Sequence, residues 1–323
     1  MTIHTAIIGL GIMGRRMAEH MALHPAFSLD AIWDPDPGSC ERAQAIVPNA
    51  KMTASAEAAI AAADLVYLAC PPAPRKAYAL TAAAAGKAVF LEKPLGVDVS
   101  ESIELVRAIS ASGVPAAVNF TQAASNALTE VTQAAETGVL GDLKGADIVV
   151  TYAHWPRQWQ KAADWLRFRA EGGMTREVIS HFLFFSERIL GPLDLVWARA
   201  DYPDQPELCE THVAARLVSA SGAPVTIMGS VGGAQPDRQE LTIKGSQESR
   251  RISNFYRNAA STGGPFEQVQ KDDADPGAVS LRAQLDDLAL LMEGKQHCLT
   301  TLEEALHVQI LVERILAGDP MKG

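Results

Sequence analysis

The 323-residue chain has little of what marks secreted or metal-binding proteins. Its few cysteines include no C-x-x-C pair, which excludes a disulfide framework and a cysteine-based metal site and predicts reduced thiols in a cytoplasmic protein. The histidines are scattered without the spacing of metal ligands, so we expect no metal. The cysteines are Cys40, Cys70, Cys209 and Cys298.

Long hydrophobic runs and excess positive charge are also missing. No apolar stretch reaches membrane-spanning length, and the N-terminus passes straight into an apolar strand, so we expect neither a membrane segment nor a secretory leader. Basic residues number 28 and acidic residues 38, giving a formal net charge of −10. Nucleic acids and anionic membranes require a positive field, so neither is an expected partner.

The first informative motif is a glycine-rich turn, Gly9-Leu10-Gly11-Ile12-Met13-Gly14, directly after the apolar run Thr5–Ile8. In a G-x-G-x-x-G pattern the glycines permit a tight turn and bring a pyrophosphate close to N–H groups at a helix N-terminus. Such glycines also occur in ordinary turns. Because a strand precedes and an amphipathic helix follows, we predict a dinucleotide site formed by Gly9, Gly11, Ile12, Met13 and Gly14.

Residues 1–120 alternate strand-like and helical patterns, which predicts a parallel Rossmann sheet with crossover helices. The expected helices include Ile12–His24 and the alanine-rich Ala54–Ala63. The expected strands are Ile3–Ile8, Phe27–Trp33, Leu65–Ala69, Ala88–Leu91 and Ala116–Phe120. We therefore expect an α/β protein that begins with an NAD(P)-binding domain over residues 1–120.

Beyond residue 120 the pattern changes to alternating apolar and polar residues with few helices between them. Strands expected at Ala223–Val231 and Asp237–Lys244 have one apolar face each. They predict an α/β domain with an open, mainly antiparallel sheet over residues 121–323, for substrate binding and oligomerisation. A single-layer sheet must cover its apolar face, so we expect a homodimer or homotetramer.

The tail returns to helical spacing. We expect its last helix to begin with a capping box of Thr300 and Glu303 and to stop at Gly318 and Pro320. These C-terminal helices are expected to pack back on the first domain.

Asp34 ends the second expected strand and follows Gly14 at the distance typical of a ribose-binding carboxylate. A carboxylate there accepts hydrogen bonds from the adenosine ribose and repels a 2′-phosphate, which favours NAD over NADP. The alternative is that Asp34-Pro35-Asp36-Pro37 forms only a polar turn. Arg15 and Arg16 keep a phosphate partner, and so NADP, open.

Together with Glu92-Lys93-Pro94 these motifs resemble the Gfo/Idh/MocA oxidoreductase family, which includes glucose–fructose oxidoreductase and inositol dehydrogenase. The resemblance extends over nearly the whole chain. It rests on Gly9–Gly14, Leu65–Pro72, Gly86–Leu95, Gly138–Asp142, Gly172-Gly173 and His181. It implies nicotinamide-dependent hydride transfer, with Cys70, Pro71, Pro72, Glu92 and Lys93 near the cofactor. Asn119, at the end of its strand, lies at the expected nicotinamide edge and joins that set.

The resemblance also implies that Lys93 is catalytic, that the peptide bond after it is commonly cis, and that Glu92 orients it. Burial and a positive nicotinamide ring disfavour the charged lysine, which moves it toward proton exchange near neutral pH. Without that context a lysine before proline is a surface turn residue. A departure from the family lies in Pro71-Pro72-Ala73-Pro74-Arg75, because relatives often have histidine near Arg75.

Relatives carry an aspartate one helical turn before a histidine, and Glu177 and His181 stand at that spacing here. We expect His181 to exchange the hydroxyl proton, Lys93 to polarise the same oxygen and Glu177 to hold His181. The assignment of the base between Lys93 and His181 stays open. Otherwise a histidine on so apolar a helix is structural. Ile179 replaces a glycine frequent in relatives.

Tryptophans and arginines gather just before His181. Indole rings stack on sugars and guanidinium groups bind carboxylates or phosphates, so these side chains are candidate substrate contacts. The alternative is that they are loop anchors and solvated arginines. The candidates are Trp155, Arg157, Trp165 and Arg176.

The sequence thus predicts reversible oxidation of a secondary alcohol on a sugar, polyol or sugar acid, with NAD as the cofactor and a small molecule as the partner. One alternative is a redox-neutral, NAD-dependent lyase or glycosidase. Another is a non-catalytic regulator that senses the dinucleotide, against which the presence of both Lys93 and His181 argues.

Overall fold

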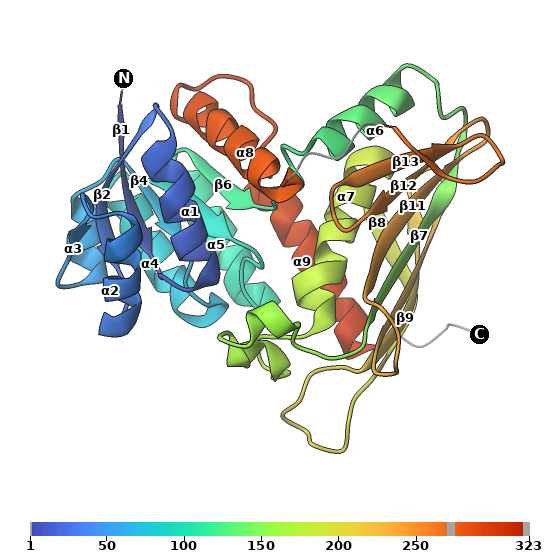
Figure 1. Ribbon diagram of the computed structural model, residues 1–323, viewed down its shortest axis with the longest axis horizontal. Coiled ribbons are helices and arrows are strands. Elements are labelled where there is room, and N and C mark those ends of the chain that lie inside the picture. The colour runs from blue at the N-terminus through green and yellow to red at the C-terminus, as the bar shows by residue number, and fades with distance from the viewer. Residues whose placement is uncertain (1, 270–274, 319–323) are drawn as a thin grey trace. The chain divides into compact units, whose positions relative to one another are not determined.

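The computed structural model describes residues 2–269 and 275–318, so the expected stop at Pro320 lies outside the described residues. The contacts divide the chain into two compact units (Figure 1). Unit 1 runs to Ala123 and also includes Leu281–Leu306, whereas unit 2 comprises Ala124–Ser280 and the chain from His307.

Unit 1 is built on a six-stranded, all-parallel sheet in the order β3-β2-β1-β4-β5-β6. Its strands are β1 (Ile3–Ile8), β2 (Phe27–Trp33), β3 (Lys51–Met52), β4 (Leu65–Leu68), β5 (Ala88–Glu92) and β6 (Ala116–Asn119). Its helices are α1 (Ile12–Leu23), α2 (Pro37–Ile46), α3 (Ala56–Ala61), α4 (Pro72–Ala84) and α5 (Val99–Ser112). The expected Rossmann sheet is confirmed, whereas β3 was missed because two residues carry no periodic signal.

The central strands β4 and β5 of unit 1 are largely apolar on both faces because helices cover both faces of a parallel sheet. Every residue of β4 and β5 is buried. The hydrophobic core joins Ile7, Met17 and Phe90 to Leu285 of helix α8 (Pro276–Met292). Part of α8 is therefore a structural component of the Rossmann unit.

Side-chain caps fix several helix starts. Ser55 Oγ accepts from Ala58 N at 3.2 Å, so α3 begins at Ala56 rather than at the expected Ala54. The capping box of α9 (Leu302–Ala317) is formed by Thr301 and Glu304, at 2.8 and 3.1 Å, and not by Thr300 and Glu303. The prediction was wrong by one residue because Thr300 is buried and pairs as a β-bridge with Val118.

Unit 2 contains an eight-stranded sheet in the order β14-β13-β12-β11-β7-β10-β9-β8. All neighbours are antiparallel except β10 and β7, so the expected mainly antiparallel sheet is confirmed with one parallel pair. Its strands are β7 (Leu143–Tyr152), β8 (Leu193–Asp201), β9 (His212–Ser219), β10 (Pro224–Val231), β11 (Arg238–Gly245), β12 (Ser249–Ser253), β13 (Arg257–Ser261) and β14 (Glu267–Gln268).

Alternation along the strands separates the two faces of this sheet. On β10, Val225 and Ile227 are buried while Thr226 and Met228 are exposed, Met228 by 58 %. Helices α6 (Asn126–Glu136) and α7 (Ser180–Leu190) lie along one side of the sheet in Figure 1. This half-buried pattern is typical of an antiparallel sheet covered by helices on one face.

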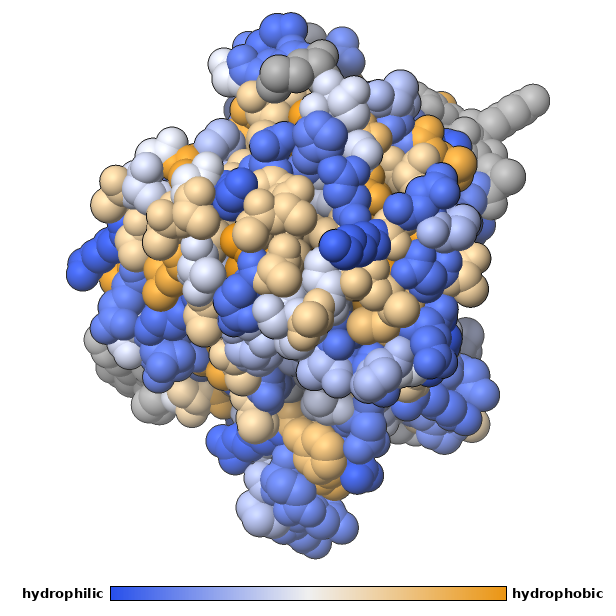
Figure 2. Space-filling model, turned by 90° about the vertical axis from the view of Figure 1, so that its left-hand side faces the viewer, coloured by the Kyte–Doolittle hydropathy of each residue, from blue (hydrophilic) through white to orange (hydrophobic). Residues whose placement is uncertain are grey.

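In the described part of the chain no helix is both long and apolar enough to cross a membrane. On the face drawn in Figure 2, hydrophobic residues are scattered among hydrophilic ones.

Candidate active site

The glycine turn closes β1 and starts α1. Gly9 has φ of +93°, and a Cβ there would lie 2.4 Å from the Cys70 nitrogen, so only glycine fits. A Cβ on Gly14 would meet the Gly9 oxygen at 1.9 Å, which explains the close approach of helix and strand. Gly11, in contrast, faces open space and caps α1 without any side-chain hydrogen bond. The start of α1 thus lacks a side-chain cap and has open space beside Gly11, and both features suit an anion at a helix N-terminus.

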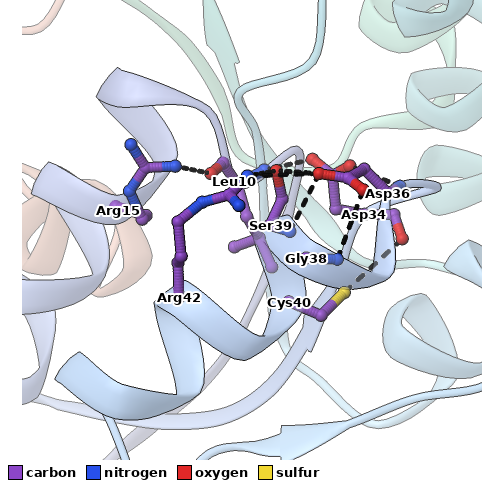
Figure 3. A network of polar contacts seen from close by, with 8 residues as sticks. All are labelled: Leu10, Arg15, Asp34, Asp36, Gly38, Ser39, Cys40 and Arg42. Carbon is purple, nitrogen blue, oxygen red and sulfur yellow. Dashed lines mark hydrogen bonds and ion pairs between the residues drawn. The ribbon is translucent and has the colours of Figure 1, made fainter.

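Asp34 fastens this turn to the end of β2 (Figure 3). Its Oδ2 accepts from Leu10 N at 2.7 Å and its Oδ1 from Asp36 N at 2.8 Å. Arg15, considered as a phosphate partner, donates to the Leu10 oxygen at 2.6 Å. Both side chains therefore stabilise the turn itself.

Asp36 caps α2 beside this network. It accepts from the backbone of Gly38 at 3.2 Å and of Ser39 at 3.0 Å, and Arg42 contacts it at 3.1 Å. The hydrogen bond from the Ser39 hydroxyl is the main cause that lowers the pKa of Asp36. Asp36 therefore stays a carboxylate that holds Arg42 at the start of α2 (Figure 3).

Glu92 ends β5 within a buried polar cluster. Its Oε1 accepts from the Tyr67 hydroxyl and from Asn119 Nδ2, the latter at 2.6 Å, and Asn119 also donates to Tyr67 at 3.2 Å. Burial raises the pKa of Glu92, against the lowering effect of the Tyr67 hydrogen bond and the Lys93 charge. Burial likewise raises the pKa of Tyr67. Lys93 follows at the end of the strand, and the Lys93–Pro94 peptide is cis, as expected.

Arg75 is a site residue that the sequence analysis did not assign. Its side chain is buried in α4 and donates to the carbonyl oxygens of Glu92 at 2.6 Å, Cys70 at 2.5 Å and Pro94. These carbonyls belong to the two turns that follow β4 and β5. Arg75 thus ties the Cys70-Pro71-Pro72 turn to the turn carrying Lys93. The sequence signal that could have indicated this role is a basic residue on the buried side of α4.

The strands β1, β2, β4, β5 and β6 of unit 1 are parallel, so their carboxyl ends meet at one edge. The glycine turn, Asp34, Cys70, Lys93 and Asn119 all lie at this edge. The structure therefore brings the predicted cofactor residues of unit 1 together.

In unit 2, His181 lies in the first turn of α7 and is buried, with an exposed fraction of 6 %. The segment before it, Thr175–Ile179, is a π-helix rather than the α-helix assumed in relating Glu177 to His181. Its start is anchored by the buried Glu210, which accepts from Thr175 N at 2.7 Å. π-Turns inside helices occur frequently at functional sites.

Glu177 contacts the aromatic segment that precedes it. Its Oε1 accepts from Gln160 at 2.9 Å and lies 3.5 Å from Arg157. The Arg157 guanidinium lies 4.7 Å from the Trp159 ring centre and also faces Tyr152 and Trp155. Glu177 and Arg157 thus form one cluster in unit 2.

The remaining substrate candidates differ in how far their side chains are engaged in hydrogen bonds within the protein. Trp155 donates its indole N–H to the Leu166 oxygen at 2.9 Å, and Trp165 is half-buried. Arg176 is buried and forms a two-pronged ion pair with Glu313 at 2.6 and 2.7 Å. It also donates to two carbonyl oxygens. Arg176 therefore has its donors engaged in structure, and we leave it out of the proposed substrate contacts.

Within the described residues no three histidine, cysteine, aspartate or glutamate side chains are placed to hold a metal ion.

A parallel six-stranded sheet with this glycine turn and acidic strand end defines a protein with a dinucleotide-binding Rossmann fold. Residues 3–120 match the model of the oxidoreductase family with an NAD-binding Rossmann fold, and residues 128–251 match the GFO/IDH/MocA C-terminal domain. The chain belongs to the Gfo/Idh/MocA oxidoreductase family.

Individual relatives are more distant. An inositol 2-dehydrogenase of Cereibacter sphaeroides is 34 % identical over 115 residues, 35 % of this chain and 34 % of the relative. An uncharacterised oxidoreductase of Streptococcus pneumoniae is 26 % identical over 176 residues, 52 % of this chain and 44 % of the relative. The aligned regions thus span less than half the length of these curated relatives.

Among solved structures, the WlbA dehydrogenase of Bordetella pertussis, in complex with NADH and UDP-GlcNAcA, superposes with a TM-score of 0.82. The match covers 99 % of both chains at 21 % identity. It supports the fold of both units and leaves the substrate of this chain to be argued from its own residues.

Proposed function

We propose that the protein transfers hydride between a nicotinamide cofactor and a secondary alcohol or carbonyl carbon of a sugar, polyol or sugar acid. The observation that carries this proposal is the placement of Lys93 at the carboxyl edge of the sheet. The same edge carries the glycine turn, and Arg75 and Glu92 fix the turn that holds Lys93. The similarity to inositol 2-dehydrogenase supports the same substrate class.

When bound, NAD supplies the hydride acceptor, and the residues of the chain bind, orient and move protons. In unit 1, the start of α1 holds the pyrophosphate, and Asp34 binds the adenosine ribose while keeping the turn closed. The same carboxylate disfavours a 2′-phosphate, so we propose NAD rather than NADP. Lys93 polarises the reacting oxygen at its Nζ.

In unit 2, we assign to His181 the exchange of the hydroxyl proton. Glu177 is assigned to this site through its contacts with Gln160 and Arg157, which place a negative charge in the aromatic segment. Glu177 already balances the charge of Arg157, so this arginine is not left to pair with an acidic substrate. The rings of Trp155 and Trp165 therefore fit a neutral polyol better than an anion.

We also propose that the chain forms a homodimer or homotetramer through unit 2, in which residues 121–323 act as the substrate-binding and oligomerisation domain. Met228 on β10 and Val196 on β8 are exposed hydrophobic side chains of its sheet, with exposed fractions of 58 % and 49 %. Light scattering after size exclusion measures the mass, and a monomer would contradict the proposal.

The function is tested by the absorbance of reduced nicotinamide, with NAD⁺ or NADP⁺ and a panel of aldoses, inositols and uronic acids. We expect turnover with NAD⁺ that falls at least about 100-fold in Lys93→Ala. Lys87→Ala, in the same segment, is the control and should retain turnover. Silence across the panel while NAD still binds would favour a redox-neutral reaction or a sensor.

A further inference from the structure

Phe255 lies at the tip of the β12–β13 hairpin in a left-handed backbone conformation. The φ values are 48° at Asn254 and 68° at Phe255. Ser253 pairs with Arg257, so Asn254, Phe255 and Tyr256 form a three-residue loop. Positive φ is the left-handed conformation that glycine adopts most easily. Asparagine suits the first position, whereas a bulky residue at the second is an outlier. Over residues 2–269 and 275–318, these two are the non-glycine residues with positive φ.

The Phe255 ring contacts two successive side chains of α7. It stacks on Phe182 with ring centres 5.4 Å apart and planes 9° apart. It meets His181 at the same distance, 5.4 Å, with planes at 82°. Successive side chains of a helix point about 100° apart, so one ring that touches both lies in the angle between them. The imidazole therefore has an aromatic wall on one side.

The ring contacts of Phe255 give a reason for its unfavourable backbone conformation. Glycine would suit this turn better than phenylalanine, but it would leave His181 without the wall. Strain that persists in a backbone marks positions where the surrounding structure gains something else, and such positions cluster at functional sites. What the hairpin gains from phenylalanine is the ring contact with His181 and Phe182.

We infer that Phe255 is a positioning residue that fixes the orientation of the His181 imidazole from the tip of the β12–β13 hairpin. The inference rests on the proton-exchanging role proposed for His181. Phe255 itself exchanges no proton. Its ring restricts the imidazole to one orientation and keeps water from that side, and small errors in the placement of a reacting group are costly to the rate.

The test compares variants that separate the ring from the turn. Phe255→Gly and Phe255→Asn both suit the left-handed position and lack the ring, whereas Phe255→Tyr keeps the ring. Asn254→Gly changes the same turn without touching the ring and is the matched control. We expect kcat to fall between about 10- and 100-fold in the first two, with KM within about two-fold, and to stay near native in Phe255→Tyr and Asn254→Gly. Native kcat in Phe255→Gly and Phe255→Asn, or an equal loss in Asn254→Gly, overturns the inference.

A double variant shows whether Phe255 acts through His181. If it does, Phe255→Gly added to His181→Ala causes no further loss of kcat, because the group being positioned is already absent. Losses that multiply point to a general structural role and overturn the inference. If His181→Ala alone retains native turnover, the proposed role of His181 fails first, and the two failures are thereby distinguished.

A further readout needs no substrate. Diethyl pyrocarbonate modifies exposed imidazoles, and mass spectrometry of the peptide containing His181 gives its rate of modification. We expect slow modification in the native protein and in Asn254→Gly, and several-fold faster modification in Phe255→Gly. An equal rate in all three proteins means that the ring neither covers nor restrains the imidazole, and overturns the inference.

Discussion

Replacing Arg75 by methionine should destabilise unit 1 strongly. Methionine fills much of the space of the arginine stem and donates no hydrogen bond. The carbonyl oxygens of Cys70, Glu92 and Pro94 would each lose a charged donor. These oxygens belong to the turns after β4 and β5, so the loss falls on the segment that carries Lys93.

The magnitude follows from the geometry. Hydrogen bonds from a charged donor contribute about 1.5–3 kcal/mol each, and three acceptors are left unmatched. Water that enters the site and the relief of a desolvated cation offset part of this loss. We therefore expect a loss of about 3–5 kcal/mol, the cost of removing one member of a buried charged contact. For a unit of this size the unfolding midpoint falls by roughly 6–20 °C.

Thermal and urea unfolding measured by circular dichroism test this prediction. Lys76→Met is the matched control, because Lys76 is the next residue of α4 and pairs at the surface with Glu104 at 2.8 Å. Surface pairs contribute little, so the control should unfold near the native midpoint. Arg75→Lys should fall between the two, since an ammonium group reaches fewer of the three oxygens. If Arg75→Met unfolds together with Lys76→Met, the bracing role of Arg75 is refuted.

Three further outcomes are expected at Glu92, Arg176 and Asp34. Burial raises the pKa of Glu92 above its ordinary value of 4.5, so the folded state holds the proton to higher pH than the unfolded chain and the unfolding free energy declines as pH rises above that value. Glu92→Gln should flatten this decline, which urea unfolding at acidic and neutral pH measures. If the unfolding free energy of the variant depends on pH as in the native protein, Glu92 is not the group responsible. Arg176→Leu leaves the partly buried Glu313 carboxylate without its charged donors and should lower the unfolding free energy by about 1.5–3 kcal/mol. A higher KM at native stability would instead restore Arg176 as a substrate contact. Asp34→Ser removes the carboxylate that repels a 2′-phosphate and the acceptor of Leu10 N. In fluorescence titrations we therefore expect weaker NAD binding and a smaller ratio of NAD affinity to NADP affinity. Unaltered affinities for both cofactors would exclude Asp34 from the ribose site.

The Rossmann sheet could be predicted from sequence because its signals are local. A buried parallel strand is a continuous apolar run, and the expected strands such as Phe27–Trp33 agree with the structure within a residue at each end. The capping residue of a helix is harder to predict where similar residues repeat. Thr300-Thr301 and Glu303-Glu304 offer two registers, and only the tertiary pairing of Thr300 with Val118 decides between them.

Site residues within short sequence motifs could be predicted, whereas those that depend on contacts between distant parts of the chain could not. Lys93 and the glycine turn stand in short patterns whose chemistry is known. The acceptors of Arg75 lie in two turns, one of them 17 to 19 positions further along the chain, and Glu313 meets Arg176 across 137 positions. Phe255 is likewise far from His181 along the chain. No local motif contains both members of these long-range pairs.

Two of the positions at which the chain departs from its family have specific partners in the structure. Arg75, near which relatives often have histidine, donates to three carbonyl oxygens, and an imidazole lacks both the reach and the number of donors for this. Glu177, where relatives have aspartate, meets Gln160 at 2.9 Å, a contact that a side chain one methylene shorter would lose without backbone movement. Each departure is therefore coupled to its surroundings, and restoring the family residue alone is not a conservative change. The substrate specificity of this chain is better sought in these coupled clusters than in the motifs it shares with its relatives.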